Sequence, residues 1–276
     1  MTGRLIKFEM RSSFRHLLIV WAALMAMTIL MCIIYAVSGM DSYAAFMDST
    51  RVAEVISAIV HIAAWLVYVA LMVALVVLTI AIVILRFHRG LLGDEGYLMH
   101  TLPVKEWQLI TSKGVVAALA VLGSSILVAI SGFMVVSTIN HVSIAQIMQD
   151  IAAFMHTEKL MPLLVVEGII IAILGILKSV YQIYASLAIG QLVNRYRILL
   201  ALGAYIGIGT VLSIIAMLGI FFGNLIGLDE WISNLSANVT AFEQVVMLFC
   251  FVVEAIQLVI FHIVTERIMS RKLNLL

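Results

Sequence analysis

Charged side chains are scarce in this sequence. Of its 276 residues, 11% are Asp, Glu, Lys or Arg and 64% are hydrophobic, whereas about a quarter of a soluble domain is charged. So few charges cannot cover a surface that faces water, and the mean hydropathy of +1.19 is far above the soluble range. These values exclude a soluble enzyme and predict that lipid surrounds most of the chain.

Proline and cysteine are also rare. Only Pro103 and Pro162 are present to interrupt a helix, which favours long unbroken helices. Cys32 and Cys250 lie in apolar runs and are interpreted as buried thiols rather than a disulfide framework. The sequence has no phosphate-binding P-loop, no HExxH zinc motif and no GxSxG nucleophile elbow. We therefore expect no catalytic residue, metal site or cofactor in this chain.

Long apolar runs occupy most of the sequence. A helix of about 20 apolar residues crosses the hydrocarbon core of a bilayer. Six such spans are predicted, at about residues 17–40, 57–85, 114–138, 162–190, 198–226 and 244–265. The predicted fold is an all-α integral membrane protein, with residues 1–276 forming a single transmembrane domain.

The basic residues alternate between the two sides of the predicted spans. Thirteen of the 16 Lys and Arg residues precede span one, follow span six, or lie in the loops after spans two and four. The opposite side holds only Arg51 and Lys159. Because Lys and Arg accumulate in cytoplasmic loops, both termini are predicted to be cytoplasmic. We expect a multi-pass protein of the cell membrane, in a bacterial plasma membrane.

Two segments outside the spans are predicted to be amphipathic helices. In residues 2–16 basic side chains recur on one helical face and apolar ones on another, which is typical of a helix in the membrane interface. The alternative is a basic leader that only sets topology. Residues 140–160 carry an apolar stripe and are predicted to lie on the extracytoplasmic surface. The two faces of the first segment are Arg4, Lys7, Arg11 and Arg15, and Ile6, Met10, Phe14 and Leu17.

The longest cytoplasmic segment covers residues 86–113. Glycines at 90, 93 and 96 are predicted to break the helix that leaves span two, and Pro103 is well placed in the first turn of a new helix. A long loop that carries charges and aromatic residues on a rigid scaffold is typical of a binding site.

A few polar residues lie within the spans, where such residues are costly and usually functional. Two interpretations stay open. They line a translocation path, or their role is structural: either Glu254 and Lys178 pair within the bundle, or Lys178 reaches towards the inner interface. Glycines at GxxxG spacing in residues 198–226 indicate close helix packing. The candidate path residues are Glu167, Lys178, Gln182, Glu254 and Gln257.

This order of segments resembles the membrane-spanning permease subunit of an ABC transporter, of the type-2 export-permease class. The layout covers the whole chain, from the basic leader at 2–16, which corresponds to an elbow helix, to the sixth span. The motif-like part is about twenty residues of the loop, with Gly93-Asp-Glu-Gly-Tyr-Leu-Met, Thr101-Leu-Pro-Val and Lys113.

The resemblance implies an ATP-driven exporter. ATP and Mg would bind a separate ATPase subunit, and a second permease subunit, identical or different, would complete the path. The loop would couple the two subunits, with Asn194 and Arg195 as a second cytoplasmic contact. Membrane lipid is the other expected partner, and no nucleic acid is expected. The implied coupling residues are Gly93, Asp94, Glu95, Gly96, Tyr97, Leu98, Met99, Leu102 and Pro103.

Two other classes of function stay open. A secondary transporter driven by an ion gradient commonly shows internal repeats and interrupted helices, and neither is evident here. A membrane scaffold or sensor would need an output domain or a partner chain.

Overall fold

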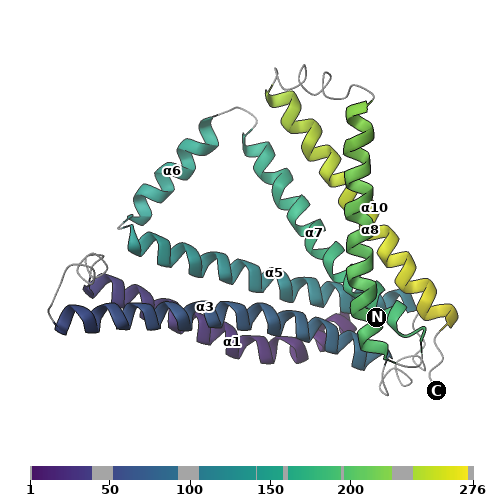
Figure 1. Ribbon diagram of the computed structural model, residues 1–276, viewed down its shortest axis with the longest axis horizontal. Helices are drawn as coiled ribbons and strands as arrows, with labels where there is room; N and C mark the ends of the chain where they lie inside the picture. Colours follow the sequence, from purple (N-terminus) through teal and green to yellow (C-terminus); the bar gives the residue numbers. More distant parts are fainter. Residues whose placement is uncertain are drawn as a thin grey trace. The chain divides into compact units, whose positions relative to one another are not determined.

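The computed structural model describes residues 2–38, 52–92, 106–140, 142–157, 161–193, 196–225 and 239–272. Within these ranges the chain is helical and contains no strand. The elements, in chain order, are α1 (Thr2–Ser38), α3 (Val52–Phe87), the π-helix η1 (His88–Leu92), α5 (Glu106–Ile139), α6 (Ile144–Thr157), α7 (Met161–Gly190), α8 (Arg197–Leu225) and α10 (Val239–Lys272) (Figure 1).

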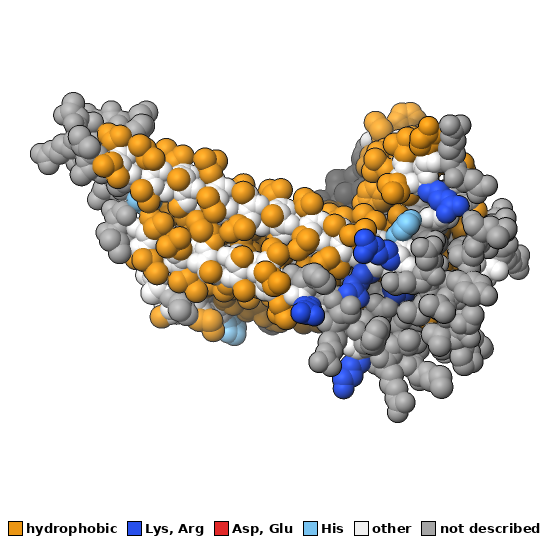
Figure 2. All heavy atoms as spheres, turned by 90° about the horizontal axis from the view of Figure 1, so that it is seen from below, with side chains coloured by type: hydrophobic (Ala, Val, Ile, Leu, Met, Phe, Trp, Pro, Cys, Tyr) orange, Lys and Arg blue, Asp and Glu red, His pale blue; other side chains and the backbone are white. Residues whose placement is uncertain are grey.

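Six helices are long and apolar enough to cross a membrane, which confirms the predicted class of all-helical, multi-pass membrane protein. Where described residues are visible on the face drawn in Figure 2, hydrophobic side chains cover most of the helical surface. Such a surface suits lipid rather than water. The candidate spans are Leu17–Ala36, Ala58–Leu91, Trp107–Ile139, Met161–Gly190, Arg197–Leu225 and Phe242–Ser270.

The second and third spans are longer than predicted. The second continues to Leu91 and the third begins at Trp107, whereas the sequence predicted ends near 85 and 114. Gly90 does not break the helix; the α-helix changes to a π-helix around it. A Cβ at Gly90 would lie 2.5 Å from Lys113 Nζ, so glycine leaves room there for the Lys113 side chain.

The first helix has no interruption between the basic leader and the first span. It is continuous from Thr2 to Ser38. Residues 2–16 are therefore helical, as predicted, but they extend the span rather than forming a separate helix. Their placement in the membrane interface stays a prediction.

The chain folds into two compact units. The N-terminal unit comprises residues 7–82 and 119–154, and contains most of α1, α3 and α5. The C-terminal unit comprises residues 1–6, 83–118 and 155–276, and contains α7, α8 and α10 together with the ends of α3 and α5. In the C-terminal unit α7 contacts both α8 and α10.

The core of the N-terminal unit follows a seven-residue repeat. On α1, Leu17, Leu24 and Met31 are fully buried, and Thr28 and Tyr35 are buried between and beyond them. This spacing keeps one seam of a helix against its neighbours, as in left-handed bundles. Lipid is as apolar as leucine, so close packing and interhelical hydrogen bonds hold such helices together. The buried apolar cluster is Leu24, Met31, Tyr35, Ala64, Tyr68, Leu75 and Val135.

A layer of buried hydroxyl groups joins the three helices of this unit. Ser131 Oγ on α5 lies 2.8 Å from Thr28 Oγ1 on α1 and 2.8 Å from the Tyr68 hydroxyl on α3. Thr28 also donates to the carbonyl oxygen of Leu24 in its own helix, at 2.8 Å. One serine therefore links both neighbouring helices within the apolar core.

A second layer lies two turns away along α1 and α5. Trp21 Nε1 donates to Ser124 Oγ at 3.1 Å, and Thr79 Oγ1 lies 3.0 Å from the same oxygen. The adjacent Gly123 lets the indole approach, because a Cβ there would lie 2.7 Å from the Trp21 ring. The seven-residue spacing of Ser124 and Ser131 thus repeats a similar three-helix contact.

The segment predicted as an amphipathic surface helix forms α6. Its first turn has a capping box: Gln146 N donates to Ser143 Oγ at 3.2 Å, and Ser143 N donates to Gln146 Oε1 at 2.9 Å. The apolar stripe is exposed, with Met148 61%, Ile151 52% and Phe154 54% accessible. An exposed stripe of this kind suits a helix that lies on a bilayer surface.

The hydroxyl layer at Ser131 is expected to stabilise the N-terminal unit. In Ser131→Ala the hydroxyls of Thr28 and Tyr68 both lose a partner, at an expected cost of about 1 kcal/mol in the free energy of unfolding. Unfolding of the purified protein by sodium dodecyl sulfate in mixed micelles measures this cost. Ser125→Ala is the matched control, since Ser125 is exposed and donates only to Val121 O of its own helix. Equal effects of the two substitutions would contradict the structural role of the layer.

Candidate functional site

The predicted coupling residues lie outside the part of the chain that the structure describes. Residues 93–105, which include all nine coupling positions from Gly93 to Pro103, lie outside the described residues, as do Asn194 and Arg195. The structure does describe the chain on both sides of these positions. The candidate site is therefore built from the two ends of the loop and from the polar residues between α7 and α10.

An aromatic stack fixes the end of α3. The ring of Phe87 lies parallel to that of Tyr184 on α7, with centroids 4.0 Å apart and an interplanar angle of 17°. Both side chains are almost completely buried. An aromatic pair of this kind contributes about 0.5–1.5 kcal/mol beyond the burial of its area. The stack holds the start of the loop against α7.

The same tyrosine also holds the start of α5. Its hydroxyl donates to the carbonyl oxygen of Lys113 at 3.2 Å. The next residue, Gly114, faces Tyr181, and a Cβ there would lie 2.6 Å from the phenol oxygen. Both ends of the loop are therefore anchored on one short stretch of α7, around Tyr181 and Tyr184.

Lys113 lies inside this anchor. Only 6% of its surface is accessible, and its Nζ lies next to Gly90 of the π-helix. The family resemblance had singled out Lys113, but its burial was not predicted. The roles of Phe87, Tyr181 and Tyr184 were also missed. In one sequence, an aromatic residue within an apolar run gives no signal of its partner.

A cavity of about 650 Å³ adjoins the turn between α7 and α8. His88 of the π-helix contributes to its lining, and His88 Nε2 lies 3.4 Å from Gln191 Nε2. The turn is tight, because a Cβ at Gly190 would lie 2.7 Å from the Arg197 carbonyl oxygen, and Tyr196 adopts a positive φ of 62°. This turn carries the predicted second cytoplasmic contact. The remaining lining residues are Tyr196, Arg197, Ile198, Leu199 and Leu202.

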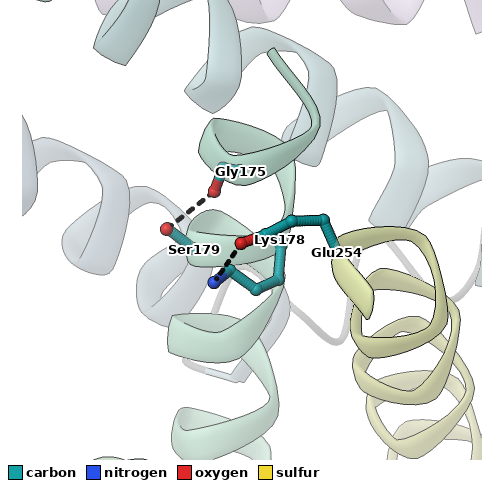
Figure 3. Close-up of polar contacts among 4 residues, drawn as sticks. All are labelled: Gly175, Lys178, Ser179 and Glu254. Atoms are coloured by element: carbon teal, nitrogen blue, oxygen red, sulfur yellow. Dashed lines mark hydrogen bonds and ion pairs between the residues drawn. The ribbon is translucent and has the colours of Figure 1, made fainter. Parts of the chain in front are cut away.

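An ion pair joins α7 to α10 within the apolar part of these helices (Figure 3). Lys178 Nζ lies 3.1 Å from Glu254 Oε1, and the two side chains are 20% and 24% exposed. Glu254 Oε2 is buried without a hydrogen-bond partner among the described residues. The pairing that the sequence left open as one of two interpretations is thus present.

The second candidate carboxyl group lies elsewhere. Glu167 is on the same helix as Lys178, eleven residues earlier, and lines a cavity of about 390 Å³ between α7 and α10. Gln244, at the start of α10, lines the same cavity. Sequence reasoning missed Gln244, because it stood at the predicted boundary of the sixth span. The only signal was its polarity next to an apolar run.

The two remaining candidate path residues are on the same pair of helices. Gln182 and Gln257 are both half-buried. Gln182 lies one turn beyond Lys178, and its backbone carbonyl oxygen accepts a hydrogen bond from Ser186 at 2.8 Å. The five predicted path residues therefore all belong to α7 and α10, and the structure brings one pair of them into direct contact.

The Lys178–Glu254 pair is expected to be energetically coupled. Lys178→Met leaves the Glu254 carboxylate without its cation, and Glu254→Gln leaves the ammonium group without its anion. Each single substitution is expected to destabilise the protein, while the double variant loses less than the sum. The coupling free energy should be about 1–3 kcal/mol. Unfolding free energies of the four proteins in the same mixed micelles give this value. Additive losses would show that the contact contributes nothing.

Comparison with known proteins does not assign this chain to a family. No protein-family model matches the sequence, no curated protein matches it, and no solved structure matches the fold. The function must be inferred from the residues themselves.

Proposed function

We propose that this chain is the permease subunit of an ATP-driven exporter and is coupled to a separate ATPase subunit. The observation that carries the proposal is the anchoring of the loop. Phe87 at its start and Lys113 at its end both contact Tyr184 of α7. A partner that displaced the loop would therefore act on α7 directly, and α7 contacts both α8 and α10.

A coupling loop needs stiff ends. A push from a partner is lost if the chain between the contact and the transmembrane helix can rotate freely. Here the loop leaves from a π-helix in which Gly90 and Leu91 are buried, and it returns into α5, near whose start Leu109 and Ile110 are buried. Packed interiors transmit displacement because they have low compressibility. This supports a lever between a cytoplasmic ATPase and the helices that line the path.

The proposed orientation places the loop on the same side as both termini. The distribution of Lys and Arg supports it, since 13 of the 16 lie on that side. In this orientation the basic segment 2–16 faces the cytoplasmic headgroups, as expected of an elbow helix, and α6 lies on the opposite surface.

The proposed complex contains a second permease subunit. Gly203 and Gly207 lie one turn apart on one face of α8, and neither has a described neighbour within 4 Å of the position that a Cβ would occupy. Small residues at helical spacing allow the backbone of another helix to approach closely. This surface is where we expect the second copy, or a related chain, to pack.

An ion-gradient-driven carrier is the alternative function. It is favoured by Glu167, whose Oε2 atom is buried without a hydrogen-bond partner among the described residues. Intramembrane carboxyl groups often form proton relays in carriers. The two functions differ in their need for an ATPase, which gives a direct test.

Capture of the tagged chain in mild detergent is expected to recover a stoichiometric P-loop ATPase, identified by mass spectrometry. A scrambled segment 94–102 should abolish recovery, because this segment is the proposed contact. The matched control is a scramble of equal length at 229–237, on the proposed opposite side of the membrane, which should leave recovery unchanged.

One outcome of the capture would contradict the permease proposal. Recovery of the chain alone in several detergents would favour the carrier. If the ATPase is recovered, the double variant D94K/E95K should reduce its coupled activity in reconstituted vesicles, because the loop would then repel basic residues of the ATPase. Unchanged coupled activity would remove the proposed role of these two carboxylates.

Reporter fusions test the orientation. Green fluorescent protein fused after Leu276 is expected to fluoresce, because it folds in the cytoplasm, whereas alkaline phosphatase at the same position should be inactive. Truncation and fusion after residue 159 should give the reverse pattern. Active phosphatase after Leu276 would invert the topology and place the loop 93–105 on the wrong side for an ATPase.

A further inference from the structure

The cavity between α7 and α10 combines an apolar wall with two polar residues. Most of its wall is apolar, with Ile170, Leu248 and Phe251 among the lining residues. Two polar side chains also face it, Glu167 from α7 and Gln244 from α10. Its volume of about 390 Å³ is within the range of small-molecule sites, which are mostly apolar with a few placed polar groups.

The two polar groups are complementary but are not joined. Glu167 Oε2 can only accept a hydrogen bond when ionised, and Gln244 Nε2 can only donate one. Both atoms are buried, and neither has a hydrogen-bond partner among the described residues, so they do not bond to each other. A buried group without a partner is costly in an apolar environment. Both residues line one cavity, so a change of side-chain rotamer would present an unpaired acceptor and an unpaired donor to a third molecule that supplies both counterparts.

The charged residues near the cavity determine which sign of charge the bound molecule should carry. The basic residue of α7 nearest in sequence among the described residues is Lys178, eleven residues on, and it is engaged by Glu254 at 3.1 Å. Glu243 precedes Gln244 on α10 and adds a second carboxyl group near the cavity without lining it. A carboxylate in an apolar wall attracts a cation and repels an anion.

We propose that this cavity binds an amphipathic amine. Its ammonium group donates to Glu167, an oxygen of its body accepts from Gln244, and its apolar part packs against Ile170, Leu248 and Phe251. If the chain is the exporter proposed above, this ligand class is its cargo, and in that respect the inference rests on the proposed function. The binding itself requires only α7 and α10.

The test uses the full-length chain in lipid nanodiscs, without any ATPase. The probe is dansylcadaverine, which joins a primary amine to a fluorescent apolar body with sulfonyl oxygens. Its N-pentyl dansylamide counterpart has the same body and no amine. Fluorescence titration, corrected with empty nanodiscs, is expected to show saturable binding of the amine and binding of the counterpart about tenfold weaker or less.

Variants assign the binding to the cavity. Glu167→Gln keeps the shape of the side chain and removes its charge, so the affinity for dansylcadaverine should fall about tenfold or more. The affinity for the counterpart should not change. Glu243→Gln is the matched control, since it removes a carboxylate next to the cavity but not in its wall, and it should retain affinity within about twofold. Gln244→Leu should weaken both probes, because both carry the sulfonyl acceptor.

Equal affinities of the two probes, or an unchanged affinity in Glu167→Gln, would overturn the proposal. The comparison of the two probes on the natural chain gives this answer even if a variant fails to fold. The result is also separate from that of the ATPase capture. Amine binding without a recovered ATPase would leave the cavity as the binding site of a carrier. A recovered ATPase without amine binding would reject only the proposal that the cavity binds an amine.

Discussion

Polar atoms inside a bilayer must find their partners within the protein, and the packing of this chain follows from that constraint. In the N-terminal unit, Ser124 and Ser131 each form hydrogen bonds with side chains on both neighbouring helices. These contacts fix the register of three helices that have no hydrophobic force to hold them together in lipid. The seven-residue spacing of the two serines matches the spacing of the buried leucines on α1, so apolar packing and hydrogen bonding specify the same arrangement.

In the C-terminal unit a single helix, α7, supplies polar contacts that satisfy the same constraint. Tyr184 of α7 stacks on Phe87 and donates to the backbone at Lys113, which joins the ends of α3 and α5 to one point. Eleven residues separate Glu167 from Lys178 on this helix, and about three turns of an α-helix fit that distance. The anchor, the ion pair and the cavity therefore all involve α7. A displacement of α7 by the loop would reach the ion pair and the cavity through one rigid element.

The sequence predicted the helices well and their contacts poorly. Runs of about twenty apolar residues identify spans without knowledge of any neighbour, because the bilayer itself sets their length. The contacts depend on which face of a helix meets another. Ser124 and Ser125 are adjacent and chemically identical, yet one is buried in a three-helix layer and the other bonds only its own helix. The Lys178–Glu254 pair could be suggested, because opposite charges in lipid have few other partners. A role for Gln244 could not be predicted in this way, since a neutral amide at the boundary of a span has many possible partners.

The hydroxyl layers of the N-terminal unit and the interface between α7 and α10 differ in how completely their polar atoms are satisfied. The hydroxyl layers of the N-terminal unit have hydrogen-bond partners on three helices, as expected of a structural core. Between α7 and α10, by contrast, Glu167 Oε2, Gln244 Nε2 and Glu254 Oε2 are buried without partners among the described residues. Unpaired groups in lipid lower stability, so their presence calls for a compensating role. A transport path must bind its cargo briefly and release it, and groups that are already paired within the protein cannot do this. The interface between α7 and α10 is therefore where function is expected.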